Sequence, residues 1–452
     1  MMGQAVDQQD RLFYEFNLDE RVPATHLLRR IDAVLDLSWL RGELKPYYSH
    51  TGCPSIDPEL MIRMLLVGYC YSVRSERRLC QEVELNLAYR WFCRLGLEDK
   101  VPNHSTFSVN RHGRFRDADV LRQVFESVVC QCMEAGLVGG EGFAVDASVI
   151  EANASRFQRV DGSEIDWSEE QLARHAIQEY VAALESENSP LNPDKLPKAL
   201  SPSDPAAAWT TRGRNKVMFG YSLNYLIDME GTVIVDVEAT PTRISKEVDA
   251  AETMLQRTEE RFALKPERIA GDVAYGTGEM LGWLVAHDID PHIPVWDQTE
   301  VAARGKFVRD DFTYDKERDV YTCPNGKVLT TSGRVDKDTT LKYLAKRSDC
   351  AQCPLKPQCT TGRERRLGRD VNQEARDYTQ AMMATEAYRQ SSIDRKQIER
   401  LFGEAKSHLS MTRLRLRGLT GARDEFLLTA TVQNLKRLVE RLAIAPPRAV
   451  AG

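Results

Sequence analysis

The sequence predicts a mixed α/β protein in which an all-helical N-terminal unit precedes a larger unit built around a β-sheet. Apolar residues recur at helical spacing through residues 56–92. After Gly139-Gly140 the pattern changes to short apolar segments that are typical of strands. The 452 residues also exceed the roughly 100–200 typical of one domain. We therefore expect a helical unit over residues 1–135 and a sheet-containing unit over residues 136–445.

Several short helices are expected in the first unit. Asp57-Pro58 has the pattern of a helix start, with the aspartate as N-cap and the proline in the first turn. Asn103 or Ser105 is suited to cap a later helix.

The second unit is expected to contain three antiparallel strands followed by alternating helix and strand. Gly142–Asp146 is predicted to be a buried strand that ends in a carboxylate, and Arg268–Asp272 is predicted to be another. Val217–Asp228 and Thr232–Ala239 alternate apolar and polar residues around a short turn, which predicts a hairpin. Helices are expected over residues 247–262, 278–287, 393 to about 409, and 423–442.

Two insertions interrupt this pattern. Residues from about 155 to 212 are rich in Glu, Ser, Pro and Asn, which favours an irregular or helical segment outside the core. Residues from about 298 to 385 are charged and carry a cluster of cysteines.

The composition, with 42% hydrophobic and 28% charged residues, is that of an ordinary globular protein. The longest apolar runs fall far short of the roughly 20 residues that span a bilayer, and the N-terminus has no signal-peptide pattern. We expect no membrane association and a cytoplasmic location.

The formal net charge of -6 hides an uneven distribution. Arginines crowd both ends, and acidic residues between 164 and 187 offset them in the total. Such basic clusters can bind DNA by neutralising its phosphates. The alternative interpretation of each cluster is a helix face exposed to solvent. The candidates for contact with double-stranded DNA are Arg77, Arg78, Arg111, Arg114, Arg413, Arg415 and Arg417.

Carboxylates at three places are candidates for a metal-dependent active site. Asp146 and Asp272 each follow an apolar strand, and a late helix carries Glu399 and Glu404. Hard cations such as Mg²⁺ take oxygen ligands, and two such ions can clamp an in-line displacement at phosphorus. Taken alone, an aspartate at a strand end is more often a turn or capping residue.

Helical geometry separates the two glutamates. At about 100° per residue, Arg395, Glu399 and Lys406 fall within a narrow stripe, whereas Glu404 lies about 140° round from Glu399. Glu399 is therefore the candidate, because a basic pair beside a metal-binding carboxylate can hold phosphates. A solvated salt-bridge face is the alternative interpretation of that stripe.

With these residues in place, the chain resembles the DDE transposases of bacterial insertion sequences, in the group whose glutamate helix carries a Tyr-x2-Arg-x3-Glu-x6-Lys signature. Arg395, Glu399 and Lys406 match it, while Ser392 occupies the tyrosine position. Residues 75–79, 86–92 and 104–107 resemble the helical domain that precedes the catalytic core in this group.

The resemblance implies an RNase-H-like (retroviral-integrase-like) catalytic core with two insertions. It also implies that Asp146, Asp272 and Glu399 hold Mg²⁺ or Mn²⁺ for DNA cleavage at the terminal inverted repeats and for strand transfer into target DNA. Arg395 and Lys406 would be accessory phosphate contacts. Pairing two element ends implies a homodimer or higher assembly. A nuclease that cuts without joining, and a DNA-binding regulator descended from a transposase, remain the alternatives.

The cysteines of the second insertion are candidates for a structural zinc site. Cys323 begins a Cys-Pro-Asn-Gly turn, and Cys350, Cys353 and Cys359 follow at short spacing. Four thiolates can hold Zn²⁺ tetrahedrally. Reduced structural cysteines or a thiol pair are the alternatives.

Overall fold

The computed structural model describes residues 16–48, 51, 55–165, 167–186, 197–212, 216–242, 244–295, 305–336 and 339–442. It divides into two compact units. The first comprises Met1–Gly136, Glu404–Leu416 and Arg423–Gly452, and the second comprises Leu137–Gly403 and Arg417–Ala422. The C-terminal segments, which the sequence places with the sheet, thus belong with the N-terminal helices.

The first unit is helical in its described residues. Its helices are α1 (Leu18–Arg21), α2 (Leu27–Asp32), α3 (Leu40–Leu44), η1 (Lys45–Tyr47), α4 (Pro58–Cys70), α5 (Glu76–Leu85), α6 (Leu87–Phe92), α7 (Ser105–Arg111), α8 (Arg114–Asp117), α9 (Val120–Glu134) and most of α20 (Gly418–Arg441). The start of α4 is confirmed, because the Asp57 side chain accepts a hydrogen bond from the Glu59 amide and Pro58 stands in the first turn. The N-cap position of α7 is His104, and the side chain of Asn103, one residue earlier, accepts from the Ser105 amide at 3.0 Å.

Buried hydrogen bonds explain why the C-terminal segments join this unit. The Arg74 guanidinium donates to Glu425 of α20 at 2.7 Å, and their side chains are 3% and 1% exposed. Arg74 also donates to the carbonyl oxygens of Ser410 and Arg413, each at 2.6 Å. Glu425 accepts in turn from the amides of Arg415 and Leu416. A buried charge needs such partners, so loop 408–416 and α20 are held by Arg74, in the turn that follows α4.

The second unit is built on a six-stranded sheet of mixed direction. Its strands are β1 (Gly142–Glu151), β2 (Ala208–Arg212), β3 (Lys216–Asp228), β4 (Ile234–Pro241), β5 (Arg268–Ala270) and β6 (Asp290–His292). The order is β2-β3-β1-β5-β6, with β4 paired to β3. β3 is antiparallel to β1, β2 and β4, whereas β1, β5 and β6 run parallel.

The predicted hairpin is confirmed as β3 and β4, joined at Met229-Glu230-Gly231. One strand was not predicted. β2, at the end of the segment expected to be an insertion, pairs with the first residues of β3.

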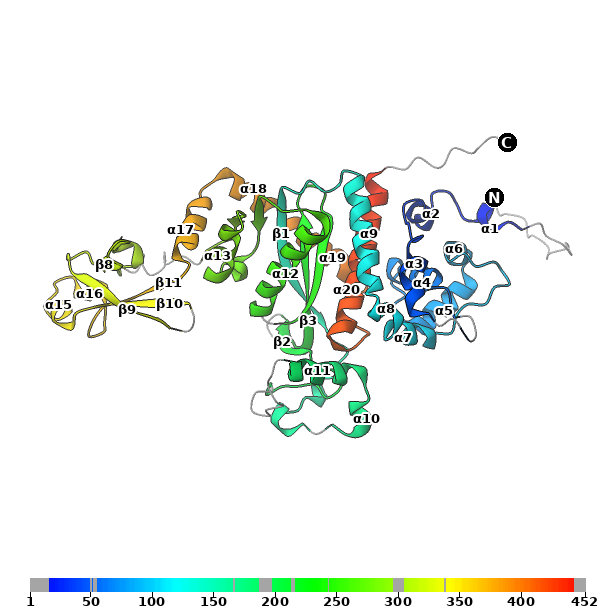
Figure 1. Ribbon diagram of the computed structural model, residues 1–452, viewed down its shortest axis with the longest axis horizontal. Coiled ribbons are helices and arrows are strands. Elements are labelled where there is room, and N and C mark those ends of the chain that lie inside the picture. The colour runs from blue at the N-terminus through cyan, green and yellow to red at the C-terminus, as the bar shows by residue number, and fades with distance from the viewer. Residues whose placement is uncertain are drawn as a thin grey trace, which may run out of the picture. The chain divides into compact units, whose positions relative to one another are not determined.

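Two helices cover one face of this sheet. Helix α12 (Ile244–Phe262) packs on β3 and β4, and α13 (Gly278–Ala286) contacts β6 (Figure 1). Their apolar residues form one buried cluster with Phe143, Val145, Leu226 and Ile269 of the strands. Because side chains alternate along a strand, Asp146 points to the opposite face from Val145.

A second sheet occupies the cysteine-bearing segment, where the sequence predicted only a charged insertion. Five antiparallel strands follow the order β11-β10-β9-β8-β7, and they share a small buried core around Phe312, Leu329 and Tyr343. The elements are β7 (Thr313–Asp315), β8 (Val320–Thr322), β9 (Val328–Asp336), β10 (Thr340–Ala345), α15 (Arg347–Ala351), α16 (Lys356–Cys359) and β11 (Arg366–Asp370).

The remaining helices of the second unit are α10 (Glu169–Leu172), α11 (His175–Ser186), α17 (Gln373–Met382), α18 (Glu386–Asp394) and the first part of α19 (Lys396–Ser407). Short 3-10 turns are η2 (Arg156–Gln158), η3 (Gly162–Glu164), η5 (Val273–Tyr275) and η6 (Arg309–Asp311). Among the described helices none is long and apolar enough to cross a membrane.

Candidate active site

The two candidate aspartates stand at matching positions on neighbouring parallel strands. The pairing of β1 with β5 ends where Ala144 meets Ala270. Asp146 and Asp272 each lie two residues beyond that last pair. Strands that run in the same direction bring such positions to the same edge of a sheet, so the two carboxylates are neighbours although they are 126 positions apart in the sequence.

Each aspartate is also held by a local hydrogen bond. Asp146 Oδ1 accepts from the Ala147 amide at 2.8 Å, and Asp272 Oδ1 accepts from the Ala274 amide at 2.8 Å. The prediction that Asp146 ends its strand is wrong. β1 continues to Glu151 through antiparallel pairing with β3. Asp272 follows β5 and caps the η5 turn.

The charge environment of Asp146 is that of a carboxylate cluster. Burial raises the pKa of Asp146 to about 6, although the Ala147 amide and the Arg395 guanidinium oppose the shift. The negative charges of Asp272 and Glu399 raise this pKa further. The Asp146 side chain, 19% exposed, therefore lies within electrostatic reach of both other candidates. Like charges gathered in this way favour a bound cation.

The helix that carries Glu399 differs from the prediction. Instead of one helix from residue 393 to about 409, α18 ends at Asp394 and α19 begins at Lys396. The backbone tightens at the junction, because the Ile398 amide bonds to the Arg395 carbonyl three residues back. Arg395 at this junction reaches Asp146, with 3.4 Å between Nη1 and Oδ2.

Packing places the start of α19 over the aspartate face of the sheet. Tyr225 of β3 is directly opposite Asp146 in the antiparallel pairing, so their side chains share a face. The Phe402 ring stacks on the Tyr225 ring, with centroids 4.9 Å apart and planes at 12°. Gln397 adds a hydrogen bond from Nε2 to the Met229 carbonyl at 3.2 Å. Glu399, which is exposed, lies between these two anchor positions in the sequence.

The other residues of the predicted stripe have separate surroundings. Lys406 lies farther along α19, in the segment that belongs to the first unit. Glu404, which helical geometry set apart from Glu399, accepts a hydrogen bond from Gln433 Nε2 at 3.1 Å. Ser392, in the tyrosine position of the signature, donates its hydroxyl to the Tyr388 carbonyl of its own helix.

Sequence reasoning missed two polar residues beside the aspartates. Glu247, in the first turn of α12, accepts a hydrogen bond from the Ser222 hydroxyl at 2.6 Å. Tyr275, which ends the η5 turn after Asp272, is 1% exposed. No local pattern marks Glu247, because a glutamate early in a helix is ordinary.

Oxygen donors of this kind suit a hard divalent cation. Within the described part of the chain, however, no group of three or more His, Cys, Asp or Glu side chains has the arrangement that would hold a metal ion. The carboxylates therefore neighbour one another without forming a finished coordination shell.

Among the candidate DNA contacts, two arginines are engaged within the protein. Arg111 is 8% exposed and pairs with Glu76 and, at 3.8 Å, with Asp424. This burial argues against the predicted phosphate contact. Arg114 stacks over the Tyr48 ring at 4.2 Å and donates to the Ser55 hydroxyl.

The other candidate arginines lie at the surface. Arg77 and Arg78 are exposed on α5, where Arg78 pairs with Glu82. Arg413, Arg415 and Arg417 are exposed side chains in the segment between α19 and α20. Arg417, which belongs to the second unit, donates from Nε to the Asn153 carbonyl at 3.1 Å.

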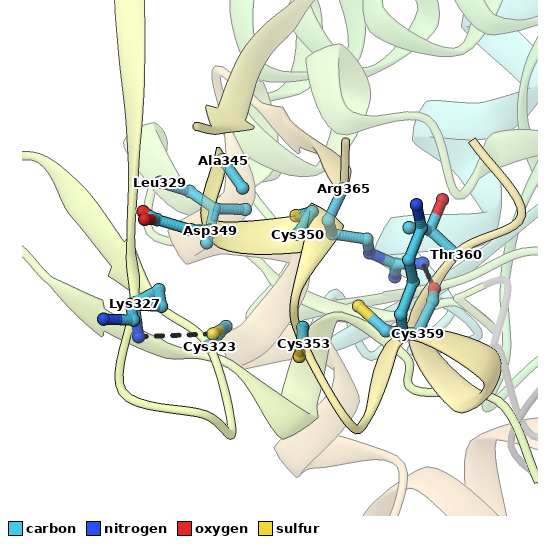
Figure 2. Close-up of a pocket in the computed structure, with 11 residues that line it drawn as sticks. Cys323, Lys327, Leu329, Ala345, Asp349, Cys350, Cys353, Cys359, Thr360 and Arg365 are labelled. Carbon is cyan, nitrogen blue, oxygen red and sulfur yellow. Dashed lines mark hydrogen bonds between the residues drawn. The ribbon is translucent and has the colours of Figure 1, made fainter. Parts of the chain in front are cut away.

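The four predicted zinc ligands line one small cavity. Cys323 comes from the β8–β9 turn, Cys350 from α15, Cys353 from the following loop and Cys359 from α16 (Figure 2). All four are free thiols, and the cavity measures about 30 Å³, enough for one water-sized occupant. The Lys327 amide donates to Cys323 Sγ at 3.3 Å. Burial and the neighbouring cysteines raise the pKa of Cys359, against the effect of the Arg365 charge.

Comparison with known families agrees with the resemblance noted in the sequence. The model of a transposase domain (DUF772) matches residues 16–113, and that of a transposase DDE domain matches residues 322–439. The second match contains Glu399 but neither aspartate. A cryo-EM structure of the piggyBac transposase synaptic complex with hairpin DNA is similar to this chain at 10% sequence identity and a TM-score of 0.32. The aligned region covers 94% of this chain and 82% of the chain in that structure.

The transposase-domain match and the transposase DDE-domain match together support a DNA transposase. The chain belongs to the DDE transposases of insertion-sequence type.

Proposed function

We propose that this transposase binds the ends of its insertion sequence, cleaves them and joins the 3′ hydroxyl to target DNA, with Asp146, Asp272 and Glu399 as ligands for two divalent metal ions. The observation that carries the proposal is the matched position of Asp146 and Asp272 beyond the last β1–β5 pair. The packing of α19 on the Asp146 face through Tyr225 and Phe402 supports a role for Glu399.

The strand arrangement supports an RNase-H-like core. The order β4-β3-β1-β5-β6, with three antiparallel strands followed by two parallel ones, places the first aspartate on the central strand and the second after its parallel neighbour. In this interpretation, β2 and the five-stranded sheet are additions to that core.

The protein residues have distinct roles in the proposed reaction. Bound Mg²⁺ or Mn²⁺ supplies Lewis-acid activation of the attacking oxygen and stabilises charge on the leaving oxygen. Asp146, Asp272 and Glu399 would hold these cations. Arg395 neutralises Asp146 and is positioned to bind a phosphate near the site, and Lys406 is the second proposed phosphate contact.

Double-stranded DNA is the proposed partner of the exposed arginines Arg77, Arg78, Arg413, Arg415 and Arg417. Phosphate contacts give affinity without depending on the metal site. Binding should therefore weaken steeply as salt rises, because bound counterions are released. Because the proposed reaction brings two element ends together, we propose a dimer or larger assembly on DNA.

The test is cleavage and strand transfer on labelled DNA that carries the ends of the element, with Mg²⁺ or EDTA. Asp146→Asn, Asp272→Asn and Glu399→Gln are each expected to abolish both activities and to leave DNA binding largely intact. The matched control is Glu404→Gln on the same helix, which keeps an oxygen acceptor for Gln433 and should remain active.

The outcomes separate the competing functions. Metal-dependent joining that is lost in Glu399→Gln supports the transposase. Cutting without joining favours a nuclease, and salt-sensitive binding with neither activity favours a regulator. Loss of DNA binding in all three carboxylate variants would contradict the proposed division between binding and catalysis.

We also propose that Cys323, Cys350, Cys353 and Cys359 bind a structural Zn²⁺. Their convergence on one cavity supports this, although the thiols would have to move to complete a tetrahedral site. Purified protein should then contain one zinc per chain, and Cys353→Ser should lose it, whereas Cys130→Ser, an exposed cysteine of the first unit, should not. Absence of zinc, with the segment still resistant to protease after chelation, would refute the proposal.

A further inference from the structure

The end of the β1–β5 pairing is a place where groups from both faces of the sheet can meet. Up to Ala144 and Ala270, backbone hydrogen bonds hold the two strands side by side. Beyond that pair β1 continues along β3, while the chain after β5 turns into η5. Asp146 and Asp272 stand where the two strands part. Helix α12, on the opposite face, contacts η5.

Glu247 is the carboxylate that α12 brings to this place. Its Oε1 accepts from the Ser222 hydroxyl at 2.6 Å, which fixes the side chain against β3. Partial burial raises the pKa of Glu247, and the negative charge of Asp272 raises it further. Glu247 and Asp272 are thus electrostatic neighbours, and one hydrogen bond leaves Glu247 with further acceptor capacity.

A buried tyrosine near these carboxylates, Tyr275, has a hydroxyl without a hydrogen-bond partner among the described residues. Tyr275 is 1% exposed. The pKa of Tyr275 is well above its usual value because of burial and because the charges of Asp146, Glu247 and Asp272 lie near its hydroxyl. A buried donor without an acceptor costs about 1–3 kcal/mol. This hydroxyl therefore points to a water or ligand among the three carboxylates.

We infer that Glu247 is a fourth carboxylate of the metal site, which binds a divalent cation together with Asp272, and that the Tyr275 hydroxyl donates to a water on that cation or to one of its carboxylate ligands. The inference rests on the proposed function, and it extends the site to the opposite face of the sheet. Glu247 and Asp272 together supply oxygen ligands of the kind that Mg²⁺ and Mn²⁺ prefer.

Binding of Mn²⁺ to the full chain, measured by calorimetric titration and by electron paramagnetic resonance without DNA, tests this directly. Glu247→Gln keeps an oxygen for the Ser222 hydroxyl but removes the charge. We expect at least one Mn²⁺ to bind about 10- to 100-fold more weakly. The matched control is Glu252→Gln. Glu252 is a partly buried glutamate of the same helix, and its pKa is raised by burial and by the charge of Glu279 rather than by an active-site carboxylate.

The variants distinguish failure of this inference from failure of the proposed function. Weakening in Glu247→Gln and Asp272→Asn, with Glu252→Gln unchanged, supports the fourth carboxylate. Unchanged Mn²⁺ affinity in Glu247→Gln, with loss in Asp146→Asn and Asp272→Asn, overturns the inference alone. A wild-type chain that binds no Mn²⁺ overturns both. If Glu247→Gln does not fold, Glu247→Asp, which withdraws the charge by one methylene, is measured against the same outcomes.

Discussion

Replacement of Glu425 by glutamine should destabilise the first unit strongly. The Glu425 carboxylate is 1% exposed and accepts from Arg74 at 2.7 Å and from the amides of Arg415 and Leu416 at 2.6 and 2.7 Å. A glutamine replaces one acceptor oxygen with a donor, so either Arg74 or the two amides face another donor. The positive charge of Arg74, 3% exposed, also loses its counterion. Breaking a buried pair on one side costs about 3–5 kcal/mol.

The assay is urea denaturation at pH 8. Glu82→Gln is the control, because its pair with Arg78 is exposed, at 37% and 67%, and should contribute less than about 1 kcal/mol. Burial raises the pKa of Glu425, so protonation favours the folded wild type, and the loss in Glu425→Gln should be smallest at high pH and grow as the pH falls. A loss of less than about 1 kcal/mol at pH 8 would refute the reasoning that this buried pair ties α20 to the turn after α4.

Two further predictions concern the second unit. Asp204 is fully buried, accepts from the Tyr221 hydroxyl at 2.5 Å, and its pKa is raised by burial from 3.8 to about 6. The fold favours the protonated form of Asp204. The free energy of unfolding of the wild type should therefore fall by up to about 3 kcal/mol, relative to Asp204→Asn, as the pH rises from 4 through 6. Parallel curves of unfolding free energy against pH for the two proteins would contradict this. Phe402→Ala removes the ring stacked on Tyr225 and should cost about 3–5 kcal/mol. It should also reduce DNA cleavage more than DNA binding, whereas equal losses in filter binding and cleavage would show that α19 does not position Glu399.

Local patterns predicted the elements that carry the candidate site, because their signals lie within a few residues. The apolar run before Asp146, the hairpin around Met229 and the N-cap at Asp57 each depend on neighbouring side chains. The interruption at Arg395 was missed, because a helical stripe gives no sign of where one helix ends and the next begins.

Features that depend on distant partners were beyond the sequence pattern. Arg111 belongs to an exposed-looking arginine cluster, yet Glu76 and Asp424 hold it inside the helical unit. Strand β2 has no apolar signature of its own and is defined by its pairing with β3. Glu247 likewise gains its neighbours only when α12 folds across the sheet.

The order of the site residues along the chain has a consequence for protein synthesis. Asp146 stands on β1 and Asp272 follows β5, the strand that pairs with β1, but α19 is translated more than 100 residues after β5. A polypeptide still on the ribosome can therefore assemble the two-aspartate edge of the sheet while Glu399 has yet to be made. Under the proposed mechanism, the capacity to cut DNA appears only late in translation, because fragments that stop before α19 lack the third carboxylate of the site.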